Sequence, residues 1–225
     1  MLIGGALLYA LANILDCADG QLARLQGSGT LLGRVIDGVA DYFSTTAIFL
    51  GIGISLSSGG NNVWWLVIGA GVSSAFHAMI FDDYQGKFIS GGSGAGDGIK
   101  QEIERFTEEI NIMRREHRDG MKVLLIHAYI GYLQFQHRLN LGATQRSVDP
   151  ERFRKENRLM IRLWSFLGPT TNRTILIVCA FVNYIGLYLW IIVLIGNLWL
   201  IISFLLQRVI NRRLEALEVI QPAIE

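Results

Sequence analysis

Residues 174–206 read TILIVCAFVNYIGLYLWIIVLIGNLWLIISFLL, a run of uncharged and mostly apolar side chains. A helix needs about 20 such residues to cross a hydrocarbon core of ~30 Å. This run is therefore too long for one ordinary span. It predicts two closely connected membrane helices, divided near Gly186.

The rest of the chain also favours a membrane protein. Of its 225 residues 51% are hydrophobic and 17% are charged, whereas a soluble domain carries about 25% charged residues. Three further apolar stretches are long enough to span, at residues 1–25, 31–56 and 63–81. We expect an all-α integral membrane protein, a polytopic helical bundle of about five spans.

The apolar start of the chain is predicted to be a membrane helix that begins abruptly. It lacks the basic leading region and the small-residue cleavage site of a signal peptide. Residues 1–225 are interpreted as one membrane domain.

A charged insertion, residues 82–169, interrupts the apolar pattern. Within it, 91–98 is predicted to be a flexible linker and 101–117 a charged helix. The apolar residues of that helix recur at spacings of three and four and form one stripe: Ile103, Phe106, Ile110 and Met113. Residues 123–139 are apolar with polar interruptions, which favours a helix on the bilayer surface or packed on the bundle over a spanning one.

The distribution of basic residues predicts the orientation. With five spans, all 20 Lys and Arg residues fall on one side, and the turns at 57–62 and near Gly186 carry none. The positive-inside rule makes the basic side cytoplasmic. The net charge of +1 gives no reason to expect nucleic-acid binding.

Four aspartates lie at the predicted cytoplasmic ends of the first two spans. Asp16 and Asp19 are three residues apart and Asp37 and Asp41 four apart, so each pair shares one face of its helix. Two antiparallel helices joined at residues 26–30 can bring the pairs together. Acidic side chains inside a membrane are costly and are functional candidates by default.

Four close carboxylates repel one another unless cations neutralise them. Oxygen ligands suit hard ions such as Mg²⁺ or Mn²⁺, which also bridge phosphate oxygens. The cluster therefore predicts a site for a diphosphate substrate with an apolar tail; the alternative is four solvated helix ends. The small residues Gly20, Ala23 and Gly33 leave room near the aspartates, although close helix packing would also explain each of them.

The segment 16–41, DCADGQLARLQGSGTLLGRVIDGVAD, resembles the signature of the CDP-alcohol phosphatidyltransferase family, D-x2-D-G-x2-A-R-x8-G-x3-D-x3-D. Every defined position is filled, by Asp16, Asp19, Gly20, Ala23, Arg24, Gly33, Asp37 and Asp41. The resemblance implies a helical-bundle enzyme, usually of six spans and often dimeric. Such enzymes displace CMP from a CDP-linked donor by attack of an acceptor hydroxyl.

The same resemblance implies the role of each matched residue. Asp16, Asp19 and Asp37 would hold Mg²⁺ or Mn²⁺ on the diphosphate, and Asp41 would be the general base and a further metal contact. The nucleotide site would be shaped by Gly20, Ala23 and Gly33, while Arg24 would orient the carboxylates or a phosphate. The family normally has another span before the motif helix, and fifteen residues precede Asp16 here, which implies an N-terminally short or reduced member.

The acceptor alcohol is left open by the sequence. Arg34, Lys87 and Arg173 are candidates to bind a phosphorylated acceptor, although an ordinary basic residue at the membrane boundary explains each of them as well. The acidic pair at 82–83 could instead contact an uncharged or cationic acceptor. His77 is interpreted as a packing residue.

Two other functions remain as alternatives. An intramembrane prenyltransferase also uses aspartates, Mg²⁺ and a diphosphate, but normally carries two separate aspartate-rich motifs and lacks this glycine and arginine pattern. A non-enzymatic metal-binding scaffold, or an inactive fragment, is the second alternative. The partners expected from the main interpretation are a CDP-linked lipid or alcohol donor, an acceptor alcohol and membrane lipid.

Overall fold

The computed structural model describes residues 2–26, 31–60, 62–91, 95–115, 120–139 and 149–220. Within these ranges the regular structure is entirely helical, as predicted. Four helical segments are long and apolar enough to cross a membrane: Leu2–Leu22, Val35–Ser57, Trp64–Ser90 and Ile185–Leu214. By length and composition, these helices indicate a polytopic integral membrane protein.

The first two helices have the predicted bounds to within one residue. Helix α1 covers Leu2–Gln26 and α2 covers Leu31–Ser57. The third, α3, covers Trp64–Ser90 and runs past the predicted end at residue 81. It ends at Gly91, whose φ of 69° is left-handed and whose N–H donates to the Lys87 and Phe88 carbonyls. Glycine adopts this conformation without steric cost, which explains the stop.

The long apolar run is divided as predicted, a few residues earlier than Gly186. Helix α7 covers Pro169–Phe181 and α8 covers Ile185–Trp190. Between them Asn183 has a φ of 56°, a left-handed value that asparagine tolerates. The helix then continues through a π-helical turn, η1 (Ile191–Gly196), into α9 (Asn197–Ile220).

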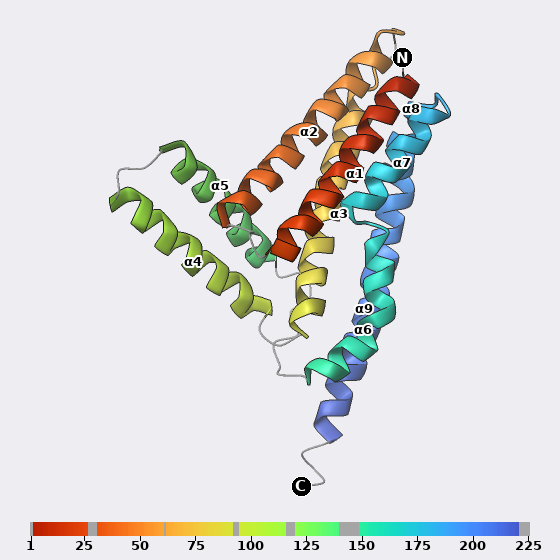
Figure 1. Cartoon of the computed structure of the whole chain (residues 1–225). Helices are drawn as coiled ribbons and strands as arrows, with labels where there is room; N and C mark the ends of the chain where they lie inside the picture. Colours follow the sequence, from red (N-terminus) through yellow and green to blue (C-terminus); the bar gives the residue numbers. More distant parts are fainter. Residues whose placement is uncertain are drawn as a thin grey trace.

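Among the described residues, the number of full-length spans is one lower than the five predicted. The predicted span before Gly186 corresponds to α7, whose 13 residues rise only about 20 Å at 1.5 Å per residue. The turns of the chain nevertheless lie at the predicted ends of the bundle. Figure 1 shows the N-terminus, the α2–α3 turn and the α7–α8 turn at one end, which we call the far end. The end where α1 ends and α2 begins is called the motif end.

A buried apolar core joins α2, α3, α7 and α8 near the far end. Ala70 of α3 and Leu189 of α8 are fully buried in it. Helix α1 adds Ala6 but leaves Leu7, Leu8 and Leu11 more than half exposed. Exposed apolar side chains of this kind are suited to contact with lipid.

The insertion begins with a hairpin of two helices, α4 (Ala95–Arg115) and α5 (Gly120–Leu139). The predicted stripe is confirmed, because Phe106 and Ile110 are buried against Ile126 and Leu133 of α5. Val35 of α2 is fully buried in the same cluster. Helix α5 therefore packs on the bundle, and it is not one of the four candidate spans. Helix α4 begins inside the predicted 91–98 linker.

A further helix, α6 (Pro150–Ser165), was not predicted from the sequence. It is capped by Asp149, whose Oδ2 accepts a hydrogen bond from the Arg152 backbone N–H at 3.0 Å. Proline is favoured in the first turn, because the missing N–H has no partner there. Helix α6 packs against α3 and α9, and its Trp164 ring stacks on Tyr84 with centroids 4.2 Å apart. This packing explains why α3 extends to Ser90.

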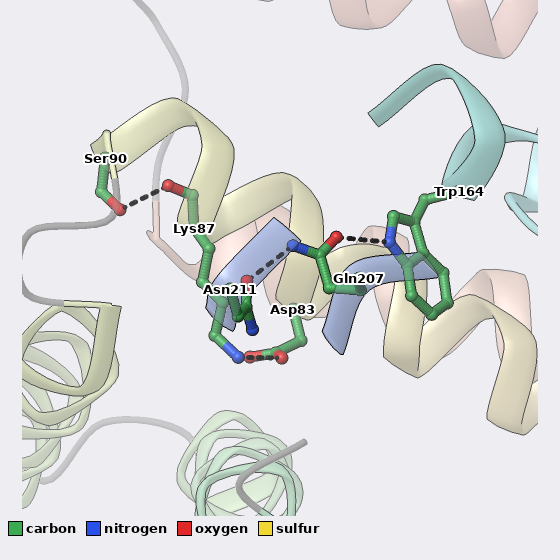
Figure 2. Close-up of polar contacts among 6 residues, drawn as sticks. All are labelled: Asp83, Lys87, Ser90, Trp164, Gln207 and Asn211. Carbon is green, nitrogen blue, oxygen red and sulfur yellow. Dashed lines mark hydrogen bonds and ion pairs between the residues drawn. The ribbon is translucent and has the colours of Figure 1, made fainter. Parts of the chain in front are cut away.

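Buried amides fix how α6 and α9 fit together (Figure 2). Gln207 accepts a hydrogen bond from Trp164 Nε1 at 3.1 Å. Its amide donates to Asn157 at 2.7 Å and to Asn211 at 2.9 Å. The same figure shows Lys87 beside Asp83 on α3. These groups form a structural cluster below the motif end.

His77 lies in a second polar contact, between α3 and the start of α9. It is 2% exposed, and its Nε2 lies 3.2 Å from Asn197 Oδ1. The Asn197 amide also donates to Ser73 Oγ at 2.9 Å. These contacts agree with the interpretation of His77 as a packing residue.

Candidate active site

The four motif aspartates lie on α1 and α2 near the motif end, and all four are exposed. Two of them converge on one cation. Arg173 Nη2 lies 2.6 Å from Asp41 Oδ1, and Arg173 Nη1 lies 3.1 Å from Asp16 Oδ2. The structure thus brings one aspartate from each predicted pair to the same guanidinium.

Helix α7 places Arg173 at this position. The helix starts at Pro169 and packs along α1, so Arg173 in its second turn reaches the carboxylates. Nη1 also donates to Asn13 Oδ1 at 3.1 Å. The Arg173 side chain is 18% exposed, whereas those of Asp16 and Asp41 are 59% and 55% exposed. The guanidinium therefore ties α7 to α1 and α2 from the inner side of the site.

The other two aspartates, Asp19 and Asp37, are not joined to this contact. Among the described residues, no three His, Cys, Asp or Glu side chains lie close enough to hold a metal ion. The four-carboxylate metal site stays a prediction. The residues nevertheless suit a divalent cation: the donors are carboxylate oxygens, and Asp16 and Asp41 already share a positive group.

A cavity of about 180 Å³ opens beside Asp41. It is smaller than the ~300–1,000 Å³ clefts that enclose drug-sized ligands. Its wall draws on α1, α2, α3, α7 and α8. The lining side chains with polar atoms are Tyr9, Asp41, Tyr42, Thr45, Ser74, Asp82, Asn172, Arg173 and Tyr188.

Neutral groups on one part of the wall hold each other in place. The Tyr188 hydroxyl donates to Asn172 Oδ1 at 2.9 Å. The Asn172 amide donates to Ser74 Oγ in a short hydrogen bond. The three side chains come from α8, α7 and α3, so this contact fixes the cavity wall across three helices.

The insertion also reaches the site. The Tyr132 ring of α5 lies edge-on to the Tyr42 ring, with centroids 6.3 Å apart. Burial raises the pKa of the Tyr132 phenol, and the neighbouring Tyr42 and Asp82 add to the increase. Tyr132 therefore stays protonated at neutral pH, beside a tyrosine that lines the cavity.

The predicted acceptor-binding residues are placed differently from one another. Arg173 lies in the cavity wall. Lys87 instead pairs with Asp83 at 2.6 Å and lies 5.2 Å from the centre of the Tyr84 ring. The side chain of Arg34 lies outside the described part of the structure.

The predicted nucleotide-site residues can be placed only in part. A Cβ added at Gly20 would meet no other atom within 4 Å, so open space adjoins this glycine. Gly33 is partly buried on α2. The side chains of Ala23 and Arg24 lie outside the described part, and their predicted roles stay predictions.

Several polar residues of the site were not singled out from the sequence, among them Tyr9, Asn13, Ser74, Asn172 and Tyr188. A signal was present for one of them, because Asn13 precedes Asp16 by three residues and so shares its helix face. Asn172 directly precedes Arg173 in the chain. No short-range pattern connects α7 to the motif, because the contact joins segments far apart in the sequence.

Comparison with known proteins identifies the segment that carries the aspartates. Residues 1–85 match the family model described as CDP-alcohol phosphatidyltransferase. A search of curated proteins and a search of solved structures each found no match. The matched residues include α1, α2, most of α3 and all four motif aspartates. Over residues 1–85, the chain is therefore similar to the CDP-alcohol phosphatidyltransferase family.

Proposed function

We propose that this protein transfers a phospho-alcohol group, most simply a phosphatidyl group, from a CDP-linked donor to the hydroxyl of an acceptor alcohol and releases CMP. The observation that carries the proposal is the position of Asp41. This family-motif carboxylate lines a small cavity and shares the Arg173 guanidinium with Asp16. A carboxylate in the wall of a small cavity is suited to take a proton from a hydroxyl bound there.

The reaction follows from that position. Asp41 accepts the proton of the acceptor hydroxyl, and the oxygen attacks the phosphorus that bears the donor alcohol. The new P–O bond forms as the bond to the bridging oxygen breaks, and the electron pair leaves with CMP. Positioned general bases typically contribute ~10²–10⁴-fold to such a rate.

A divalent cation, Mg²⁺ or Mn²⁺, bound by Asp16, Asp19, Asp37 and Asp41 would neutralise the diphosphate and improve CMP as a leaving group. Arg173 supports this assignment because it already holds a positive charge between Asp16 and Asp41. The proposed nucleotide site is completed by Gly20, Ala23, Arg24 and Gly33.

A lipid-linked donor suits the surroundings of the aspartates. Helix α1 exposes Leu8, Leu11 and Ile14 along its length and then carries Asp16. Acyl chains could follow the apolar face while the diphosphate reaches the carboxylates. The basic side of the bundle, where this site lies, is proposed to be cytoplasmic. The homodimer that the family resemblance implies stays a prediction.

Prenyl transfer is less well supported. It also needs carboxylates and a diphosphate, but the family match covers the glycine and arginine positions as well as the aspartates. A non-enzymatic metal-binding role would not explain a cavity with a motif carboxylate in its wall.

The test uses the full chain purified in detergent with Mg²⁺ and CDP-diacylglycerol. CMP release is measured over a panel of alcohols, phosphorylated and unphosphorylated. We expect release with at least one acceptor, and a loss of about 10²-fold or more in Asp41→Asn. The matched control is Glu104→Gln, an exposed carboxylate on α4 outside the cavity, which should keep full activity. No CMP release with any acceptor would overturn the proposed function.

A further inference from the structure

The cavity beside Asp41 contains a second carboxylate, and it indicates what kind of acceptor fits. Asp82 comes from α3 and Asp41 from α2, and both line the same space of about 180 Å³. Asp82 has no assigned role in the motif. Its place in the wall of the same small cavity makes it a candidate contact for a molecule that presents a hydroxyl to Asp41.

Positive charge in the described cavity wall is limited. Arg173 is the cation among the described lining residues, and it contacts both Asp41 and Asp16. The other nearby basic residue on α3, Lys87, is paired with Asp83 and does not line the cavity. Arg173 is therefore engaged by the motif aspartates, and no described cation of the wall pairs with the Asp82 carboxylate.

The remaining polar wall is neutral and preorganised. Asn172 is held between the Tyr188 hydroxyl and Ser74, and Thr45 and Tyr42 lie in the same wall. Such groups exchange hydrogen bonds with hydroxyls. A phosphate monoester needs positive groups instead, and like charges in a small space discriminate against it.

We propose that this cavity takes a small acceptor alcohol without a phosphate, and that Asp82 accepts a hydrogen bond from a second hydroxyl or an ammonium group of that acceptor. Asp82 then determines specificity: it positions the acceptor and excludes phosphorylated forms of it. The inference rests on the proposed function, because the acceptor must present its reacting hydroxyl to Asp41.

Two neighbouring aspartates give a matched experiment. Asp82 lines the cavity, whereas Asp83 pairs with Lys87 outside it. The variants Asp82→Asn and Asp83→Asn are purified with the wild-type chain, and their thermal unfolding is compared. CMP release from CDP-diacylglycerol is then measured with inositol, glycerol, serine and ethanolamine, and with inositol 1-phosphate and glycerol 3-phosphate.

The wild-type chain should use an unphosphorylated alcohol at least tenfold more efficiently, in kcat/KM, than the phosphate esters. Asp82→Asn should raise the KM for that alcohol about tenfold or more while the KM for the donor stays unchanged. Asp83→Asn should change neither KM. If Asp82 binds an ammonium group, Asp82→Asn should lose more efficiency with serine or ethanolamine. If Asp82 binds a second hydroxyl, the larger loss should occur with inositol or glycerol.

Preferred use of a phosphate ester by the wild-type chain would overturn the inference and leave the proposed function standing. Equal acceptor KM values for Asp82→Asn and Asp83→Asn would also overturn it. If Asp82→Asn unfolds, Asp82→Glu takes its place, because the longer carboxylate keeps the charge and should shift the acceptor KM alone. Absence of CMP release with every acceptor would instead refute the proposed function itself.

Discussion

Arg173 Nη2 lies 2.6 Å from Asp41 Oδ1, and this contact joins α7 to the second motif helix. The other guanidinium nitrogen reaches Asp16 on α1. A single side chain therefore balances two carboxylates that the motif alone would leave repelling each other. The two terminal nitrogens of the Arg173 guanidinium contact oxygens of two different carboxylates, whereas a lysine side chain ends in a single nitrogen.

Removing the Arg173 charge should weaken the metal-free protein. In Arg173→Gln we expect the free energy of unfolding without divalent ions to fall by about 0.5–1 kcal/mol, a modest effect because the carboxylates are exposed and screened. Thermal unfolding in detergent with EDTA measures the change. Arg158→Gln, an exposed position on α6, is the control and should have no effect.

The same substitution should strengthen metal binding. A fixed guanidinium and a divalent cation compete for Asp16 and Asp41, so Arg173→Gln should show a larger rise in melting temperature at a given Mg²⁺ concentration. A ligand that binds the folded state raises its stability by an amount that grows with the logarithm of [L]/Kd, which makes the melting temperature a readout independent of turnover. Asp16→Asn should show a smaller rise. Identical Mg²⁺ dependence in wild type and Arg173→Gln would show that the two cations do not share a site.

Gly196 should not tolerate alanine. A Cβ there would lie 2.6 Å from His77 Cε1, and the His77 ring is held by Asn197. Overpacking of this kind costs about 1–3 kcal/mol, so the melting temperature should fall. Gly186→Ala on α8 is the matched control, because no atom lies within 4 Å of its added Cβ. That variant should be neutral or slightly more stable.

Gln207→Leu should loosen α6 from α9. The change leaves the buried Trp164 Nε1 and Asn157 Oδ1 without their partner, at about 1–3 kcal/mol for each unsatisfied group. Limited proteolysis should cut near α6 faster than in the wild-type chain. Gln134→Leu, at an exposed position of α5, should leave the cleavage rate unchanged. Equal rates in the two variants would contradict a role for Gln207 in docking α6.

Hydropathy alone predicted the bounds of α1 and α2, because their ends coincide with clear changes in composition. It missed α6, a helix without a long apolar run, although Asp149 and Pro150 formed a readable helix start. It also ended α3 at residue 81, because the reason for its continuation, the Trp164 ring on Tyr84, comes from a distant segment.

The candidate site was likewise predicted only in part from the sequence. Spacing placed Asp16 and Asp41 on faces that could meet, and the family match confirms the segment that carries them. Arg173 was singled out as an acceptor ligand, but its contacts are with the aspartates themselves. That partnership depends on how α7 packs along α1, which no local pattern contains. Asp82 was noted in the sequence, yet only the shared cavity connects it with Asp41.

The π-helical turn Ile191–Gly196 has a consequence for the register of the last helix. A π-turn holds one residue more than the α-helical path, and each α-helical residue turns the helix by about 100°. If the same residues were wound as a regular α-helix, everything after the turn would be rotated by about that angle. Asn197 would then turn away from His77, and Gln207 away from Trp164 of α6. The extra residue thus works as a phase shift between the face that α8 packs against α3 and the face that α9 packs against α6.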